Sequence, residues 1–289
     1  MRILILGAKG NLGGQLVKVF NVDDNEVTDW DKEEVDITDR ELILKKVSDV
    51  KPDLIINAAA YNAVDKCEDS NAQYEIAKKI NIDGPKFLAE AALAVGAILV
   101  HYSSDYVFDG KNKSGYKETD EPSPINRYGK TKYHGEKRII EFSGVGLKWY
   151  IIRSSKLFGP KGDSEQAKES FFDLILRLSN EKKEFNMIEG EEISCFTYTS
   201  DLAVKTKEIV DGDFSYGIYH IVNAEPTSWY KAAKFLFELT NKQDIKLNAI
   251  KSEGFPRPAK RPKYSILLNT KLTPLRSWKE ALREYLKDN

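Results

Sequence analysis

A tyrosine and a lysine four residues apart, Tyr128 and Lys132, have the types and spacing with the clearest chemical content. On a helix this spacing places both side chains on one face. A phenol ordinarily ionises near pH ~10, and a neighbouring ammonium favours the phenolate, so we expect Lys132 to lower the pKa of Tyr128. Tyr128 would then be able to act as a general acid towards a carbonyl group at neutral pH.

Two serines, Ser103 and Ser104, follow an apolar run that predicts a strand. A hydroxyl at the carboxyl end of such a strand can hydrogen bond to the same carbonyl as the tyrosine. Neighbouring residues in a strand point to opposite faces, so only one of the two serines can serve. We favour Ser104, and Ser103 is its competitor.

A glycine motif, G-x-x-G-x-x-G, runs from Gly7 to Gly13 directly after the first apolar run. Gly7 permits a tight turn, Gly10 lets a pyrophosphate approach the backbone, and Gly13 lets a helix pack closely on the sheet. The helix that begins at Asn11 and Leu12 presents free N–H groups to an anion. The motif therefore predicts a dinucleotide site.

An acidic residue is expected about 20 residues beyond such a motif, where it binds the ribose hydroxyls and repels a 2′-phosphate. Asp29 and Asp31 both meet this condition, and we favour Asp31. Lys32 can offset the repulsion. The sequence thus leans towards NADH without excluding NADPH.

Apolar, β-branched runs alternate with helical patterns through the first half of the chain. This alternation predicts a doubly wound parallel sheet of the Rossmann type. We expect a dinucleotide-binding domain over 1–155 and a smaller substrate-binding lobe over 156–289, interleaved with the sheet. The predicted strands are Arg2–Leu6, Glu26–Thr28, Leu54–Asn57, Ala97–Tyr102 and Trp149–Arg153, and the predicted helices between them are Asn11–Phe20, Asp39–Val47, Ala72–Val95 and Tyr128–Phe142.

Composition excludes several classes of partner. Lys and Arg number 44 and Asp and Glu 45, without a block of like charges, which argues against nucleic acid or a membrane surface. Two distant cysteines suit free thiols in a reducing compartment, and the first apolar run is too short for a signal peptide, so we expect a cytoplasmic protein. The three histidines, His101, His134 and His220, share no metal-ligand spacing, so no metal is expected. A homodimer is plausible because symmetric dimers are common.

Over nearly its whole length the chain resembles the extended short-chain dehydrogenase/reductases, and among them the dTDP-4-dehydrorhamnose reductases. The most specific segment is Phe255–Ser265, which resembles the family's P-x-P-A-x-R-P pattern. The other segments that carry the resemblance are the glycine motif, Asn57–Tyr61, Ala63–Asp65, Ser103–Gly110 and Tyr128–Lys132.

This resemblance implies an NADH- or NADPH-dependent reduction of the 4-keto group of a dTDP-6-deoxyhexulose to give dTDP-L-rhamnose. Ser104, Tyr128 and Lys132 would form the catalytic triad. We predict that Arg257, with Lys260 and Arg261, faces the substrate's diphosphate, where arginine gives bidentate contacts. The other expected cofactor contacts are Asp36, Ile37, Ala58, Ala59, Ala60, Tyr61, Tyr128 and Lys132, and the other expected substrate contacts are Ser104, Asp105, Tyr106 and Lys156.

Two departures from the family pattern leave the sugar specificity open. Lys156 stands where the family often has an aromatic residue after Arg-x-Ser, and Cys195-Phe196 replaces part of a Gly-Ser-Pro-Thr turn. Two alternatives are a silent regulatory subunit resembling the β-subunit of methionine adenosyltransferase, and another sugar-nucleotide reductase, epimerase or dehydratase. The complete Pro-rich segment argues against the first, and a single acid, Asp105, argues against a dehydratase.

Overall fold

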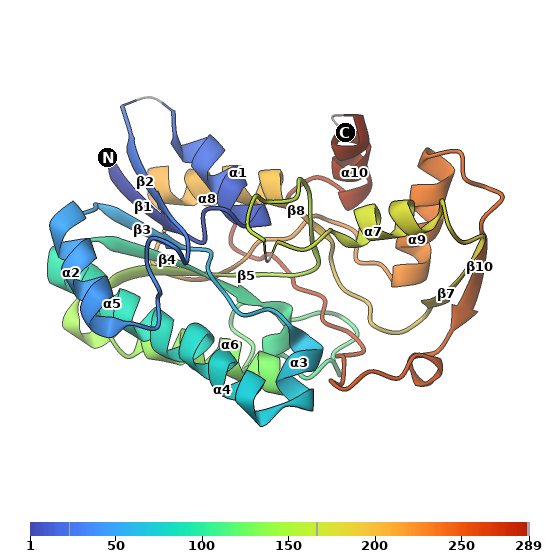
Figure 1. Cartoon of the computed structure of the whole chain (residues 1–289), viewed down its shortest axis with the longest axis horizontal. Helices are drawn as coiled ribbons and strands as arrows, with labels where there is room; N and C mark the ends of the chain where they lie inside the picture. Colours follow the sequence, from blue (N-terminus) through green and yellow to red (C-terminus); the bar gives the residue numbers. More distant parts are fainter. Residues whose placement is uncertain (23, 166, 288–289) are drawn as a thin grey trace.

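A six-stranded parallel sheet forms the centre of the molecule in a computed structural model, which describes residues 1–22, 24–165 and 167–287 (Figure 1). The strand order is β2-β1-β3-β4-β5-β9, so the winding reverses between β1 and β3. Ligands of such sheets bind where the winding reverses, outside the carboxyl ends of the strands. The strands are β1 (Arg2–Leu6), β2 (Glu26–Trp30), β3 (Leu54–Asn57), β4 (Ile98–Ser104), β5 (Lys148–Ser154) and β9 (Gly217–His220).

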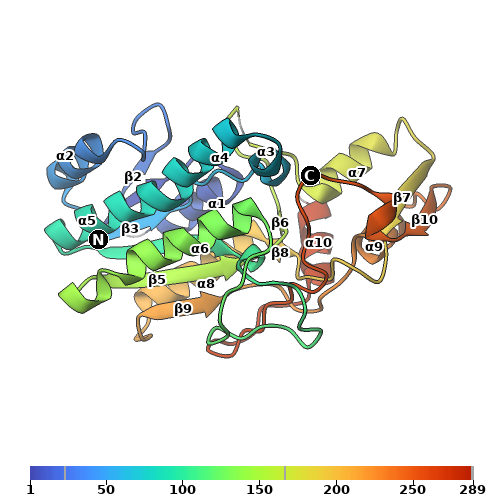
Figure 2. The ribbon, with the colours of Figure 1, turned by 90° about the horizontal axis from the view of Figure 1, so that it is seen from below.

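Helices cover both faces of this sheet, as Figures 1 and 2 show from two directions. The inner strands β1, β3, β4 and β5 are mostly buried and largely apolar, which is typical of parallel sheets covered on both faces. The expected doubly wound Rossmann-type fold is confirmed. On one face lie α1 (Asn11–Phe20) and α8 (Thr199–Asp211), and on the other α2 (Arg40–Val50), α5 (Gly84–Val95) and α6 (Arg127–Ile140).

One predicted helix, Ala72–Val95, is interrupted. The structure divides it into α4 (Asn71–Lys78), a π-helical turn at Lys79–Asp83, and α5. Pro85 in the first turn of α5 cannot donate the N–H that a continuous α-helix needs. The wide turn also brings the backbone of Asn81 against Gly135 of α6, where an added Cβ would lie 2.1 Å from the Asn81 carbonyl oxygen.

A smaller lobe lies beyond the carboxyl ends of the strands and has its own aromatic-rich core. It includes a two-stranded parallel sheet; the apolar pattern near Phe185–Ile188 predicts β7, but β10 was missed because none of its residues is fully buried and its exposed residues do not alternate. The short helix α3 (Val64–Asp69) and the two-residue strands β6 (Leu157–Phe158) and β8 (Thr197–Tyr198) were also missed. The lobe's longer elements are α7 (Phe171–Leu178), β7 (Glu184–Ile188), α9 (Trp229–Leu239), β10 (Lys246–Ile250) and α10 (Trp278–Lys287).

Within the described residues, no helix has the length and apolar character needed to cross a membrane.

Candidate active site

The glycine motif forms a tight loop between β1 and α1. Gly7 has φ +73, and an added Cβ there would lie 2.7 Å from the Ala59 nitrogen. At Gly13 an added Cβ would lie 2.0 Å from the carbonyl oxygen of Gly7. Gly10 precedes α1 without a side-chain cap, so the N–H groups of the first turn are available to an anion. The loop thus has the shape and the donors that a dinucleotide diphosphate requires.

Asp31 lies beside this loop, as the spacing predicts. Its Oδ2 accepts a hydrogen bond from the Lys9 N–H at 3.0 Å, and its Oδ1 accepts one from the Lys32 N–H at 2.8 Å. The ammonium of Lys9 pairs with Glu33 at 3.0 Å and Glu34 at 3.6 Å. Asp31 rather than Asp29 is therefore the acid that bonds to the glycine loop.

The segment Ala58–Tyr61 follows β3 and packs against the glycine loop at Gly7. The Ala58 N–H donates to the Leu6 carbonyl at 2.9 Å, and the Ala59 N–H donates to Asn57 Oδ1 at 3.1 Å. These bonds keep small side chains beside Gly7, which leaves room for a flat ligand. Asp36 and Ile37 lie in the loop after β2, where Asp36 accepts hydrogen bonds from Thr38.

Ser104 is the serine that reaches Tyr128. A hydrogen bond between them opposes the rise in the pKa of Tyr128 that burial causes. Ser104 Oγ also donates to Asp105 Oδ1 at 3.0 Å and accepts from the Tyr106 N–H at 3.1 Å. By contrast, the buried Ser103 hydroxyl has no hydrogen-bond partner among the described residues. The expected choice of Ser104 over Ser103 therefore agrees with the geometry.

The expected effect of Lys132 on Tyr128 is wrong for this structure. The pKa of Tyr128 lies well above its ordinary value, because burial disfavours the phenolate more than the bond to Ser104 favours it. Lys132 donates instead to the Tyr102 carbonyl at 2.7 Å, and burial lowers its pKa to about 8. A buried, protonated phenol is nevertheless the form that a general acid needs.

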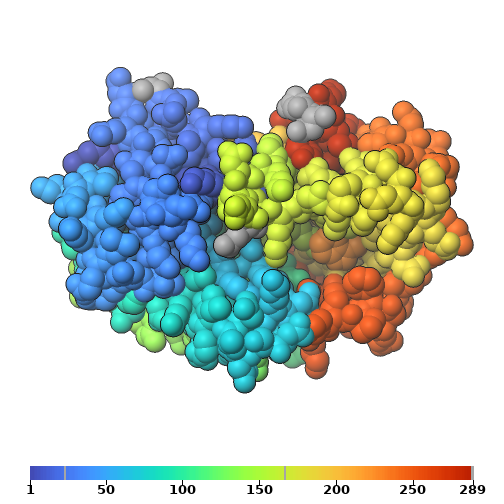
Figure 3. All heavy atoms as spheres, viewed as in Figure 1, coloured from blue at the N-terminus to red at the C-terminus, as the bar shows by residue number. Residues whose placement is uncertain are grey.

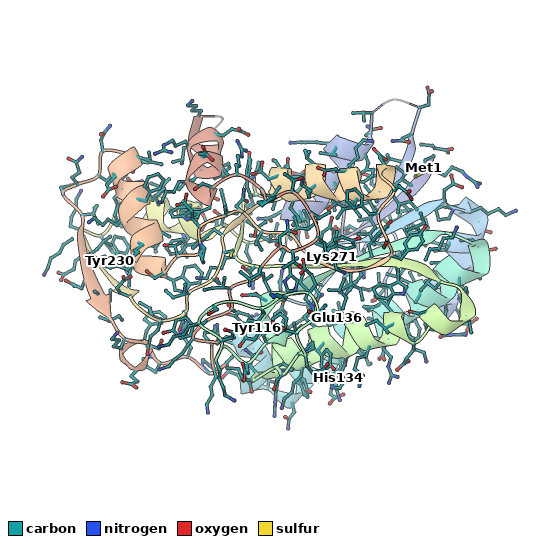
Figure 4. The ribbon with its side chains drawn as sticks, turned by 180° about the vertical axis from the view of Figure 1, so that it is seen from behind. Met1, Tyr116, His134, Glu136, Tyr230 and Lys271 are labelled. Carbon is teal, nitrogen blue, oxygen red and sulfur yellow. The ribbon has the colours of Figure 1, made fainter. Side chains whose placement is uncertain are left out.

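A buried ion pair joins α6, the helix that carries Tyr128 and Lys132, to strand β5. Glu136 lies one turn beyond Lys132 on α6 and is 1% exposed, and both its oxygens bind the guanidinium of Arg153 in β5, at 2.9 and 2.6 Å. Figure 4 shows Glu136 on α6, two residues beyond the exposed His134. The negative charge of Glu136 partly opposes the fall in the pKa of Lys132.

Asp105 connects the serine to the lobe. Its Oδ2 accepts a hydrogen bond from Ser265 Oγ at 2.6 Å, and burial raises its pKa to about 6 despite the bonds from Ser265 and Ser104. Tyr106 packs edge-on against Tyr128, with ring centroids 5.8 Å apart. The structure therefore brings three predicted substrate residues, Ser104, Asp105 and Tyr106, together with Tyr128.

Lys156 approaches the same place from the lobe. It has φ +41, which is unusual for a lysine, and it donates to the Glu192 carbonyl at 2.9 Å. Its ammonium lies 3.9 Å from the ring centroid of Trp229. Burial lowers the pKa of Lys156 to about 8, and the charges of Asp105 and Glu192 oppose this shift.

The arginines of the Pro-rich segment are already paired with acids. The guanidinium of Arg257 forms an ion pair with the buried carboxylate of Glu192. Arg261 binds Asp65 of α3 through two bonds, at 2.8 and 2.7 Å. Arg257 and Arg261 also line a groove of about 760 Å³ that extends to Tyr264. A diphosphate in this groove would meet arginines whose charge is partly neutralised.

Sequence reasoning gave no role to three residues of this site: Ser265, Glu192 and Trp229. Ser265 ends the segment that carries the family resemblance, so its position could have marked it. Glu192 accepts from Trp229 Nε1 at 3.0 Å and has φ +55. No local pattern could have marked Glu192 or Trp229, because their contacts come from distant parts of the chain. No cluster of three or more potential metal ligands occurs among the described residues.

A glycine loop at the reversal point of a parallel sheet, beside a Tyr-x-x-x-Lys helix and a serine, defines an oxidoreductase of the extended short-chain dehydrogenase/reductase type. The chain belongs more narrowly to the family described as "RmlD substrate binding domain", whose model matches residues 1–289.

Its relatives agree over nearly full length. The dTDP-4-dehydrorhamnose reductase of Aggregatibacter actinomycetemcomitans is 35% identical and covers 98% of this chain and 97% of its own. A structure described as a dTDP-4-dehydrorhamnose reductase from Clostridium acetobutylicum is 39% identical, with a TM-score of 0.90 and 99% of both chains covered. The Bacillus anthracis reductase in complex with NADP is 34% identical, with a TM-score of 0.90, covering 100% of this chain and 99% of its own.

Proposed function

We propose that this protein is an NAD(P)H-dependent dTDP-4-dehydrorhamnose reductase, which reduces the 4-keto group of a dTDP-6-deoxy-4-hexulose to give dTDP-L-rhamnose. The observation that carries the proposal is the hydrogen bond between Ser104 and Tyr128, with Lys132 one turn further along the same helix. The family membership and the full-length relatives support the choice of substrate.

The nicotinamide cofactor, when bound, supplies the hydride that reaches C4 of the sugar. Tyr128 Oη donates the proton that the carbonyl oxygen needs, so that C=O becomes CH–OH. Ser104 donates a hydrogen bond to the same oxygen and orients it. Lys132, as a cation and hydrogen-bond donor, would hold the ribose of the cofactor. The small residues Ala58 to Ala60, with Gly7, leave room for the ring.

The substrate would lie between the carboxyl end of β4 and the lobe. Asp105 accepts hydrogen bonds from sugar hydroxyls, Tyr106 lines the pocket beside Tyr128, and Lys156 donates from the opposite side. The guanidinium of Arg257 would leave its ion pair with Glu192 and bind the diphosphate instead. Lys156 has a strained, positive φ, and its ammonium packs on the ring of Trp229. Backbone strain of this kind gathers at functional sites, which supports its assignment as a substrate contact.

The choice of cofactor is a separate proposal. Asp31, Glu33 and Glu34 surround the position where an adenosine ribose would lie, which favours NADH. Lys9 and Lys32 are the cations available to a 2′-phosphate, and the bound NADP of the Bacillus anthracis relative supports use of NADPH as well. We therefore propose that both cofactors serve, with contacts from Asp36 and Ile37 to the adenosine half.

Three further proposals concern organisation. The dinucleotide site belongs mainly to residues 1–155 and the sugar site mainly to 156–289, although β9 of the second part completes the sheet of the first. We also propose a cytoplasmic location, where dTDP-sugars are made, and a homodimer. Size-exclusion chromatography with light scattering tests the dimer.

The test is oxidation of NADH and NADPH, followed by absorbance at about 340 nm, with the dTDP-4-keto-6-deoxyhexulose generated enzymatically. Turnover, with dTDP-L-rhamnose identified by mass spectrometry and NMR, is the expected result. Cofactor binding without turnover of any dTDP- or UDP-4-ketohexose would overturn the proposal in favour of a regulatory binder. Turnover of a different ketohexose alone would retain the reductase and reject the stated sugar.

A further inference from the structure

The segment that joins β6 to α7 folds back onto the glycine loop. We call its described residues, 160–165 and 167–168, the strap. The Ser164 N–H donates to the Lys9 carbonyl at 2.9 Å, and Gly162 packs so closely that an added Cβ would lie 2.2 Å from the same oxygen. In Figure 3 the yellow-green atoms of this part of the chain lie directly against the blue atoms of the N-terminal quarter.

A single side chain, that of Asn11, holds the strap at two points. Its Nδ2 donates to the Lys168 carbonyl at 2.9 Å, and its Oδ1 accepts from the Gly162 N–H at 3.3 Å. Asn11 is the first residue of α1. The strap is therefore fastened to the very turn whose N–H groups are offered to the cofactor diphosphate.

The other end of the strap faces α3, across the candidate active site. Burial lowers the pKa of Lys168, the charge of Lys66 in α3 lowers it further, and that of Asp65 opposes both. The same Asp65 binds Arg261 of the Pro-rich segment. The strap thus reaches from the glycine loop towards the side of the molecule that carries Tyr128 and Tyr106.

A loop that only linked β6 to α7 would not need specific hydrogen bonds to the glycine loop and α1. Instead, the strap makes two bonds with Asn11 and one with Lys9, and it contains a glycine where any side chain would displace the glycine loop. Backbone atoms are used on the strap side of all three bonds. The strap is therefore shaped to its position on the glycine loop.

We propose that the strap is the outer wall of the dinucleotide site and holds the bound cofactor in place. It rests on the proposed function in one respect, because the ligand it retains is the nicotinamide dinucleotide. Asn11, Gly162 and Ser164 are positioning residues: they fix the strap over the first turn of α1. Cofactor leaves when these contacts open, so the strap sets the rate of cofactor release.

The first test is the dissociation rate of NADPH and NADH from the full-length protein, measured by stopped-flow fluorescence. Gly162→Val forces the strap away from Lys9, and we expect release to become about tenfold faster with the association rate nearly unchanged. Ser164→Pro removes the N–H that bonds to Lys9 and should speed release about fivefold, the change expected for one hydrogen bond. The matched control is Gly144→Ala, where an added Cβ meets nothing within 4 Å.

A second measurement does not depend on variants. Lys161 lies within the strap and its side chain is exposed, so trypsin can cut after it. Saturating NADPH should slow cleavage after Lys161, because the strap then opens less often. Equal cleavage with and without NADPH, or release rates in both variants equal to that of the wild type, would overturn the strap proposal.

The outcomes separate the two proposals. If the wild type turns over the sugar but Gly162→Val and Ser164→Pro release cofactor at the normal rate, the strap is only a connection and the reductase stands. If the wild type binds neither NADPH nor NADH, the proposed function itself fails. Because melting temperature is measured for each variant, a merely structural effect would appear as lost stability without faster release.

Discussion

Two lysines with the same lowered pKa stand on opposite sides of the candidate active site. Burial lowers the pKa of Lys132 and of Lys156 to about 8. Lys132 bonds to a backbone carbonyl in the sheet, and Glu136 lies one helical turn away. Lys156 lies on an aromatic ring, bonds to the carbonyl of Glu192, and faces the carboxyl group of Asp105.

The two lysines differ in the structural elements that position them. Lys132 is placed by a regular helix packed on a regular sheet, and its surroundings follow from short-range rules. Lys156 itself has a left-handed backbone conformation in the connection between β5 and β6, and its partners come from remote segments. The first arrangement suits chemistry that every substrate shares, and the second suits recognition of one particular sugar.

The strongest test of the Lys132 side is Tyr128→Phe. This substitution removes the acid but keeps the ring, so turnover should fall about 100-fold or more while cofactor affinity stays unchanged. Steady-state kinetics and cofactor titration provide the measurement. Tyr133→Phe is the matched control, because that hydroxyl bonds to Glu121 away from the site, at 3.1 Å. Turnover in Tyr128→Phe within a few-fold of the wild type would contradict the assignment.

The pH dependence tests whether the two lysines act together. Lys132 loses its charge as the pH rises through its pKa of about 8, so kcat/KM should fall about tenfold per pH unit well above pH 8, and loss of the Lys156 charge should add no more than about fivefold. Protonation of Asp105, whose pKa is about 6, removes its negative charge and weakens the hydrogen bonds that it accepts, so kcat/KM should also fall below pH 6. An alkaline limb that persists in Lys156→Met belongs to Lys132. A flat profile from pH 7 to 10 would contradict both assignments.

The Lys156 side is tested by Lys156→Met. Loss of one donor to the sugar should raise the KM for the sugar nucleotide about fivefold, with little change in kcat or in cofactor affinity. The exposed Lys130→Met serves as the control. A fall in kcat equal to that of Tyr128→Phe would contradict the assignment of Lys156 to substrate recognition rather than to the chemical step.

The smallest expected effect concerns the link between the two sides. Asp65→Asn weakens the pair with Arg261, whose acid is 39% exposed, so solvent screening limits the loss of unfolding free energy to about 1 kcal/mol or less. Urea denaturation measures it. Asp69→Asn, an exposed acid on the same helix, should be neutral. A loss above about 3 kcal/mol would mean that Asp65 carries more of the fold than its exposure suggests.

Much of the fold could be predicted because its rules are local. Apolar runs and helical patterns predicted all six strands of the main sheet, including a strand at Gly217–Val222 that corresponds to β9, and the spacing of Tyr128 and Lys132 predicted their shared helix face. The π-helical turn at Lys79–Asp83 could not be predicted, because it depends on the contact between Asn81 and Gly135. The rise in the pKa of Tyr128 was missed for a similar reason, since burial is a property of the assembled site.

The substrate side was less predictable. The resemblance marked Asp105 and Lys156, but nothing in the sequence showed that Arg257 would pair with Glu192 or Arg261 with Asp65. These contacts join residues that are far apart in the chain. Ion pairing with remote acids has no periodic signature, so only the folded structure could reveal it.

The position of β9 also has a consequence for how the protein is made. β9 pairs with β5, from Tyr150 opposite Gly217 to Arg153 opposite His220, and residues 155–216 lie between the two strands. At ordinary rates of synthesis the ribosome needs several seconds to deliver β9 after β5 has emerged. During that interval β5 is an unpaired edge, which is a template for aggregation. A nascent chain stalled in this stretch, or a fragment ending at residue 155, would therefore depend on a chaperone to stay in solution.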